Sequence, residues 1–150
     1  MPRIDVTFTA GAIAADSRTE LAPRIAEAML RWEGAPDAPF FREIAWVHFH
    51  ELDEGGAYTA DGPALDSHFI VDVMIPVGAL SDRRRAGLVE ELSALVSKAA
   101  WLGDADALRV WVIVHEVPDG FWGAGGQIVR FEQLRQAADA ERAEAGSAAI

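Results

Sequence analysis

The chain has 150 residues, of which 51% are hydrophobic and 25% charged, the composition of one globular domain with a core of its own. Its formal net charge of −11 argues against nucleic-acid binding, which needs a basic surface. Cysteine is absent, and the sequence has neither a basic-then-apolar leader nor an apolar run of the roughly 20 residues that cross a membrane, so we expect a cytoplasmic protein without membrane contact.

The first strand is predicted directly behind the initiator methionine. Ile4, Val6 and Phe8 alternate with polar residues, which is the period of a strand. Pro2 precedes them, so removal of Met1 would make the chain begin with a secondary amine. Burial lowers the pKa of an α-amino group from about 7.7–8.0, and general base catalysis requires the free base. Pro2 is therefore a candidate catalytic residue, although proline at this position also commonly serves only to protect a terminus.

A helix is predicted after a turn of small residues at 10–16. Asp16 or Ser17 is the expected N-cap, and Glu20 completes a capping box with Ser17. The helix is expected to end before Gly34, which opens a segment rich in proline and alanine. Its apolar stripe, which we expect to pack against a sheet, consists of Leu21, Ile25, Ala28, Met29 and Trp32.

A second strand is predicted over residues 42–52. Its even-numbered residues share one face and its odd-numbered residues the other. Because both sets are largely apolar, we expect a strand that is covered on two sides. Residues 53–67 contain paired glycines and a Gly-Pro step, and they are interpreted as a connection.

The second half of the chain repeats this order. Residues 69–77 form an apolar run typical of a strand, and Ser81 or Asp82 caps a second helix that stops near Gly103. Residues 108–115 are the most strand-like segment of all.

The end of the chain is predicted to form a hairpin and a helical tail. Residues 118–120 turn the chain, and residues 127–131 form a short closing strand before the tail. The glycine-rich residues 123–126 lack the lysine and the following helix of a phosphate-binding loop, so we interpret them as a tight hairpin.

The two halves resemble each other. Residues 45–51 align with 110–116 at an offset of 65, and residues 10–13 with 77–80 at an offset of 67. We therefore predict an α/β (α+β) fold of two fused β-α-β units, with four strands in one sheet, both helices on one face and a C-terminal hairpin.

The predicted single domain spans residues 1–150, with repeat units at 2–56 and 68–131 and a tail at 132–150. The other sheet face is expected to be apolar as well, which calls for a covering partner. A second copy of the chain, in a homo-oligomer, is the natural source.

The combination of Pro2, the duplication and the tract 116–126 resembles the tautomerase superfamily, and more narrowly a fused 4-oxalocrotonate tautomerase. The resemblance covers residues 2–131. It implies a homotrimer that acts on a small-molecule substrate without cofactor or metal, through an amino-terminal proline that moves a proton between a dienol and an enone. Fused relatives in this superfamily also include dehalogenases, hydratases and a decarboxylase that use the same proline.

Matched position by position, the resemblance gives Pro2 the catalytic amine and Trp122 the aromatic wall of the pocket. Phe69 stands at the position that matches Pro2 in the second half, so one proline site per chain is expected. Glu116 matches the acid that activates water in some dehalogenating relatives; the alternative is a strand-end acid paired at an interface.

The arginines that bind carboxylates in the family are missing from this sequence. The arginine just past the first strand maps near Ile13 in one half and near Leu80 in the other, and the arginine on the second strand maps to Trp46 and Trp111. The usual dicarboxylate substrates are therefore not expected, and an apolar carbonyl compound, or an acid held by another arginine, fits better. By nearness to strand ends, the candidates for that arginine are Arg3, Arg42, Arg109 and Arg130.

Histidines on the second strand allow a competing interpretation. His48, His50 and Glu54 have the spacing of a cupin metal site, and period two places both imidazoles on one strand face. A cupin needs many antiparallel strands and a later histidine, whereas two helices are predicted here, so we expect no metal. His50 is taken as a pocket or interface residue and a candidate substrate contact; its repeat equivalent, His115, favours a structural role.

We therefore expect a cytoplasmic tautomerase-type isomerase in which Pro2 transfers a proton on a small carbonyl or unsaturated acid. One alternative keeps the same site but changes the reaction. In it, Pro2 is a general acid and Glu116 activates water, so that the enzyme is a hydratase, a dehalogenase or a decarboxylase. Another is a binding or assembly protein that kept the fold without catalysis.

Overall fold

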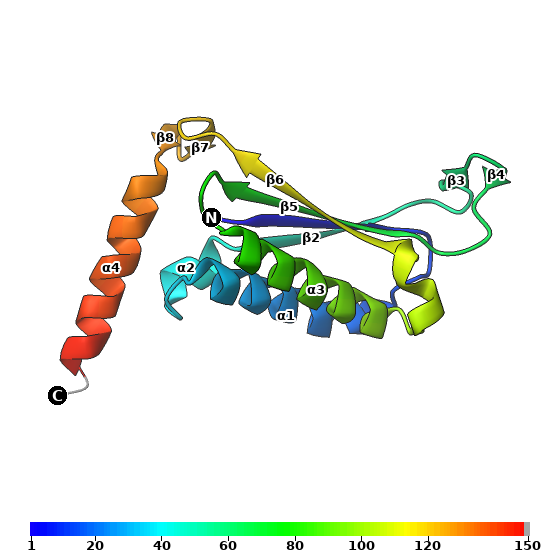
Figure 1. The fold of residues 1–150 in the computed structure, drawn as a ribbon, viewed down its shortest axis with the longest axis horizontal. Coiled ribbons are helices and arrows are strands. Elements are labelled where there is room, and N and C mark those ends of the chain that lie inside the picture. The colour runs from blue at the N-terminus through cyan, green and yellow to red at the C-terminus, as the bar shows by residue number, and fades with distance from the viewer. Residues whose placement is uncertain (149–150) are drawn as a thin grey trace.

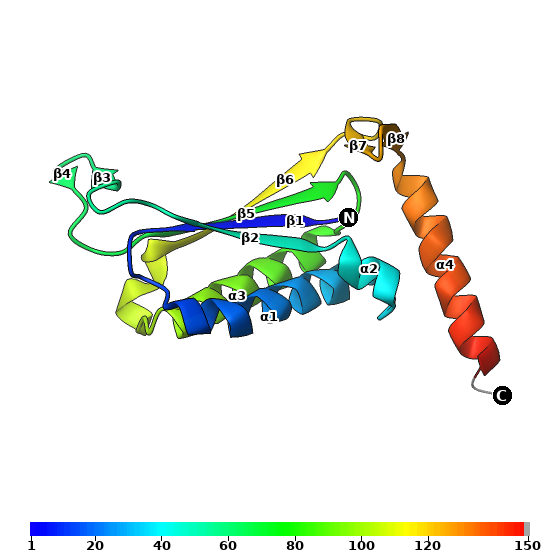
Figure 2. The same cartoon turned by 180° about the vertical axis from the view of Figure 1, so that it is seen from behind.

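The computed structural model describes residues 1–148, and it shows a four-stranded sheet with two long helices on one face (Figure 1, and from behind in Figure 2). The helices are α1 (Ala15–Glu33) and α3 (Asp82–Ala99). In sheet order the strands are β2 (Trp46–Glu51), β1 (Arg3–Phe8), β5 (Phe69–Pro76) and β6 (Val110–Val117). The predicted fold class is confirmed. Among residues 1–148, no helix combines the length and the apolarity needed to cross a membrane.

The strand pairing follows from the duplication. β1 pairs in parallel with β2, and β5 in parallel with β6, as a crossover helix in each unit requires. The two units join through the antiparallel pair β1–β5, in which Asp5 lies opposite Asp72. Because the halves run in opposite directions, equivalent strand ends of the two units lie at opposite ends of the sheet, while Asp5 and Asp72 meet near its middle.

The core lies between the sheet and the two helices. The predicted alternation holds in β1, where Ile4, Val6 and Phe8 are fully buried. Burial of side chains of this size stabilises the fold by about 1.5–3 kcal/mol each. The predicted stripe of α1 also faces the core, through Leu21, Ile25, Ala28 and Met29 as buried residues and Trp32 as a partly buried one.

The start of α1 differs from the prediction. Its N-cap is Ala14, and no side chain caps it, so the expected cap at Asp16 or Ser17 is wrong. The guanidinium of Arg18 donates to the carbonyl oxygen of Ile13 at 2.9 and 3.0 Å, which ties the first turn of α1 to the residues before it. In α3 the predicted cap is confirmed, with the Ser81 hydroxyl accepting from a backbone N–H.

Two predicted strands begin later than expected. A short helix, α2 (Pro39–Glu43), takes the first residues of the predicted strand 42–52, because Pro39 suits the first turn of a helix. A 3-10 helix, η1 (Asp104–Arg109), likewise takes Arg109 out of β6.

Small hairpins project beyond the two ends of the sheet (Figure 1). The predicted hairpin consists of β7 (Trp122–Ala124) and β8 (Gln127–Val129). A second one, which the sequence did not indicate, lies within the connection 53–67 as β3 (Tyr58–Thr59) and β4 (Gly62–Pro63). Each hairpin follows the last strand of its β-α-β unit, so the duplication includes them.

The tail forms a helix, α4 (Phe131–Ala148), which leads away from the β7–β8 hairpin (Figure 2). It contacts the body through Ala138, which packs with Leu30 and Phe41, and through Arg142, whose guanidinium donates to the carbonyl oxygen of Gly34 at 2.6 Å.

The sheet face away from the helices, called here the open face, is polar at its centre. The expectation of a second apolar face is wrong, because the residues of β1 that alternate with Ile4, Val6 and Phe8 are the polar Arg3, Asp5 and Thr7. Apolar side chains occur on its outer strands, where Trp46 and Trp111 are 59% and 61% exposed.

The contact between the two long helices gives a stability prediction. A Cβ added at Gly87 of α3 would lie 2.2 Å from the ring of Trp32 on α1. We expect Gly87→Ala to lower the free energy of unfolding by about 1–3 kcal/mol through overpacking, measured by urea denaturation. Gly146→Ala in α4 is the matched control, since its Cβ meets nothing within 4 Å and alanine favours a helix. Equal stability of the two variants would contradict the prediction.

Candidate active site

Pro2 directly precedes β1, one of the two central strands of the sheet, and it is buried. Its carbonyl oxygen accepts a hydrogen bond of 3.1 Å from the backbone N–H of Trp46, which continues the β1–β2 ladder by one step. Pro2 is therefore held by the sheet itself and does not belong to a loose terminus.

A cavity of about 560 Å³ opens beside Pro2. Trp46 of β2 and Met74 of β5 form one part of its wall, and Phe121 and Trp122 of the C-terminal hairpin form another. Because β1 and β5 are antiparallel, the hairpin of the second unit closes over the proline of the first. The structure thus brings Pro2 and Trp122 into one cavity, as the resemblance implies.

Arg3 is the one charged side chain in the wall of this cavity, among the residues that the structure describes. Its Nε donates to the Asp5 carboxylate at 2.6 Å. Its two terminal guanidinium nitrogens make no hydrogen bond or ion pair within residues 1–148, and the side chain is 43% exposed. Of the four candidate arginines, Arg3 is therefore the one placed to contact a ligand beside Pro2.

Met1 lies between this cavity and a neighbouring one that Glu33 lines. Burial lowers the pKa of the Met1 α-amino group, with the Glu33 carboxylate acting in the opposite sense. Burial raises the pKa of Glu33 in turn. While Met1 is attached, the nitrogen of Pro2 is an amide, so any chemistry at that nitrogen requires its removal.

Glu116 does not line the Pro2 cavity. Its Oε1 lies 3.4 Å from the backbone nitrogen of Gly78, in the turn after β5. The equivalent acid of the first unit, Glu51, accepts from the N–H of Gly11 at 2.7 Å and forms an ion pair of 2.7 Å with Arg18. Both acids therefore hold the turn that follows the first strand of their unit.

The other candidate arginines lie elsewhere. Arg130 pairs with Asp119 at 3.1 Å beside the hairpin. Arg109 pairs with Asp66 at 3.1 Å and with Asp106 at 3.0 Å. Arg42 pairs with Asp37 at 2.6 Å.

Arg109 lines a separate cavity of about 450 Å³ together with Phe69 and Trp111. This second cavity is the repeat equivalent of the Pro2 cavity, at the opposite end of the sheet. Phe69 takes the place of the proline there and lies in the interior of the chain, so this cavity offers no terminal amine.

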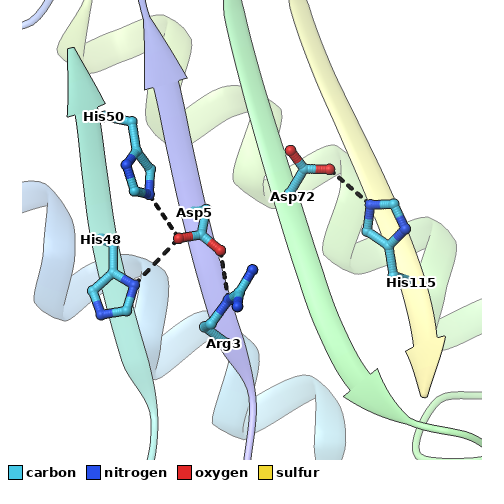
Figure 3. A network of polar contacts seen from close by, with 6 residues as sticks. All are labelled: Arg3, Asp5, His48, His50, Asp72 and His115. Atoms are coloured by element: carbon cyan, nitrogen blue, oxygen red, sulfur yellow. Dashed lines mark hydrogen bonds and ion pairs between the residues drawn. The ribbon is translucent and has the colours of Figure 1, made fainter. Parts of the chain in front are cut away.

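His50 lies on the open face, outside the Pro2 cavity, in a polar cluster (Figure 3). Its Nε2 is 2.8 Å from Asp5 Oδ1, and Nδ1 of His48 is 3.2 Å from the same oxygen. Burial raises the pKa of Asp5, but hydrogen bonds from His50 and His48 and the charge of Arg3 outweigh it, so the pKa lies below its usual value.

Sequence reasoning paired these histidines with the wrong acid. Glu54 lies in an exposed turn beyond β2, whereas the carboxylate beside both imidazoles belongs to Asp5. The one sequence signal for this contact was Asp5, an acidic residue that lies between the buried Ile4 and Val6 in the first strand. It became meaningful only with the parallel register that sets Asp5 beside His48.

No protein-family model matches the sequence, and no curated protein matches it. Several solved structures do. N1, a member of the cis-3-chloroacrylic acid dehalogenase (cis-CaaD) family, matches with a TM-score of 0.73 and 22% identity, over 89% of this chain and 89% of N1. Pt0534 inactivated by 2-oxo-3-pentynoate matches with a TM-score of 0.70 and 21% identity, over 84% of this chain and 94% of Pt0534.

A wild-type fused 4-OT that forms a symmetric trimer matches with a TM-score of 0.69 and 18% identity, over 85% of this chain and 94% of that one. At these identities the likeness shows the fold. The resemblance to fused 4-OT that the sequence indicated is confirmed as a likeness of fold.

The turn contacts of Glu51 generate a pH prediction. The N–H of Gly11 and the guanidinium of Arg18 lower the pKa of the Glu51 carboxyl in the folded protein. Its stabilisation is therefore present above the unfolded-state pKa of about 4.3 and is lost as the pH falls through the folded-state pKa. We expect Glu51→Gln to lower the Tm at pH 7, with the difference from wild type vanishing in acid. Glu116→Gln, which loses only a long contact, should shift the Tm less.

Proposed function

We propose that the protein is a tautomerase-type isomerase in which Pro2, freed by removal of Met1, transfers a proton on a small carbonyl compound or unsaturated acid. The observation that carries the proposal is the placement of a buried Pro2 in a largely apolar cavity whose one charged side chain, within the described residues, is Arg3. Burial favours the uncharged form of an amine, which is the form that accepts a proton.

In the proposed reaction, the Pro2 nitrogen takes a proton from an enol hydroxyl or an acidic α-carbon. The resulting secondary ammonium returns the proton to the α-carbon, to the vinylogous carbon or to the oxygen, so the substrate is isomerised and the amine is regenerated. The terminal nitrogens of Arg3 bind the substrate carboxylate or the developing oxyanion. No cofactor takes part, since a proton is all that moves.

The aromatic wall has two roles in this mechanism. A substrate bound against Trp46 and Trp122 would displace water from the cavity, which strengthens the contact between Arg3 and an anionic substrate. Trp46 is held in place because its Nε1 donates to the carbonyl oxygen of Glu43 at 3.0 Å. A cavity of about 560 Å³ with one cation fits a small acid with an apolar end better than a dicarboxylate.

The likeness to a cis-CaaD family member makes hydration or dehalogenation the second candidate. That chemistry needs a carboxylate to activate water, and Glu116 was the candidate acid. Within residues 1–148, Glu116 faces the turn after β5, and no acid lines the Pro2 cavity. This geometry favours proton transfer over the addition of water. A wild-type protein that isomerises no enol or dienol substrate would instead favour decarboxylation or a non-catalytic role.

We expect Pro2→Ala to reduce the tautomerisation of phenylenolpyruvate, and any slower turnover of the dicarboxylate 2-hydroxymuconate, by about 10²-fold or more, measured by the change in ultraviolet absorbance. Glu116→Gln is the matched control and should keep the wild-type rate, since the residue does not reach the cavity. Intact mass should show that Met1 is absent from the active protein. Retention of Met1 in protein that turns over these substrates would refute the role of Pro2.

A second probe labels the amine directly. Pt0534, which has a similar fold, is inactivated by 2-oxo-3-pentynoate, an alkyne conjugated to a ketone. A free Pro2 amine should add to the alkyne carbon remote from the ketone, while a proton goes to the neighbouring carbon. We expect the mass to rise by one inhibitor molecule per chain, on the amino-terminal peptide. An equal gain on any other peptide would point to a nucleophile other than Pro2.

We also propose that the chain assembles as a homotrimer, as the matching fused 4-OT does. The supporting observation is the pair of exposed tryptophans, Trp46 and Trp111, on the outer strands of the open face. Light scattering should give three times the chain mass of 16.2 kDa. Trp111→Glu should shift the protein towards monomer, because a charge there opposes burial. A monomeric wild type would refute the assembly.

A further inference from the structure

We propose that Asp5, His48 and His50 form a binding site for a divalent transition-metal ion of the zinc type on the open face. The site is separate from the proposed catalytic cavity, because none of these three residues lines the Pro2 cavity. All three belong to one chain, so each protomer carries a complete set of ligands.

The three ligand atoms already converge (Figure 3). Asp5 Oδ1, His48 Nδ1 and His50 Nε2 all lie within 4.8 Å of one another, and the oxygen is 3.2 and 2.8 Å from the two nitrogens. Two ligands about 2.1 Å from one tetrahedral ion are about 3.4 Å apart. Small rotations of the side chains therefore bring all three atoms to bonding distance from one ion.

The fold places these side chains for a simple reason. His48 and His50 are two residues apart on β2, so they point to the same face of the sheet. The parallel register sets Asp5 beside His48, and Thr7, the next residue on that face of β1, beside His50. The small threonine leaves the Asp5 carboxylate as the group between the two imidazoles.

The surroundings suit a cation. Asp5 Oδ2 is held by Arg3 Nε at 2.6 Å, which orients the carboxylate and leaves Oδ1 for the ion, as outer partners do in metal sites. Asp72 lies opposite Asp5 on β5 and adds a second negative charge nearby. Within a single chain the side chains of His48 and His50 are 46% and 53% exposed, so the chain itself does not cover them.

The ligand set determines the class of ion. Two imidazoles and one carboxylate suit zinc and the neighbouring late transition metals, whereas calcium and magnesium prefer oxygen ligands. Three protein ligands leave a fourth tetrahedral position for water.

The duplication supplies an internal control. In the second unit Asp72 and His115 form the same kind of pair, with 2.7 Å between Oδ1 and Nε2. The position that matches His48 is occupied by Ile113, so this half has two of the three ligands. The proposal thus predicts one site per chain, in the first unit only.

The test is a titration of untagged, metal-stripped, full-length protein with zinc chloride by calorimetry. We expect one zinc ion per chain. His48→Ile, which copies the second unit, and His50→Ala should each weaken binding by at least about tenfold. His115→Ala should leave the affinity unchanged. Ile113→His should raise the stoichiometry to two.

Cobalt chloride provides an independent readout. Bound Co²⁺ should give visible absorbance bands in wild type and in His115→Ala, and these bands should be lost in His48→Ile. Circular dichroism would show that the variants are folded, which is expected because His48 is half exposed. Two results would overturn the proposal: no zinc binding by the wild type up to about 1 mM, or wild-type affinity in His48→Ile and His50→Ala.

Discussion

β1 and β5 pair in antiparallel fashion at the centre of the sheet, with Asp5 opposite Asp72, and the other features of the molecule depend on this pairing. It turns the second β-α-β unit end over end relative to the first. The C-terminal hairpin therefore arrives at the start of β1, where Trp122 faces the cavity of Pro2. A single unit would have the proline without the wall that shelters it, which is a physical reason for the two units to act as one domain.

The same pairing lets the halves diverge without loss of the fold. The buried positions of both units stay apolar, since both pack against the shared core. Two differences change what each unit offers to a ligand: the buried Pro2 is matched by the buried Phe69, and His48 on the open face is matched by Ile113. Each unit keeps the acid that holds its turn, Glu51 or Glu116, because that contact serves the backbone.

Much of the fold could be predicted because strand and helix periods are local. Ile4, Val6 and Phe8 gave the first strand, and Ser81 gave a true helix cap. The errors came from contacts that are remote in sequence or that compete locally. Arg18 reaches back to Ile13 and onward to Glu51, and α1 begins at Ala15, one residue before the expected cap at Asp16 or Ser17. Pro39 starts a helix inside a stretch whose apolar pattern also suited a strand.

The sequence by itself determined the duplicated β-α-β order, the apolar faces that build the core and the position of Pro2 directly before the first strand. Only the tertiary structure decided which polar groups meet. It set Arg3 in the cavity wall, turned Glu116 away from it, and joined His48 and His50 to Asp5 in place of Glu54. The physical reason is that a strand's own period fixes which face a side chain points to, whereas its neighbours depend on the register between strands. That register is settled by packing across the whole sheet.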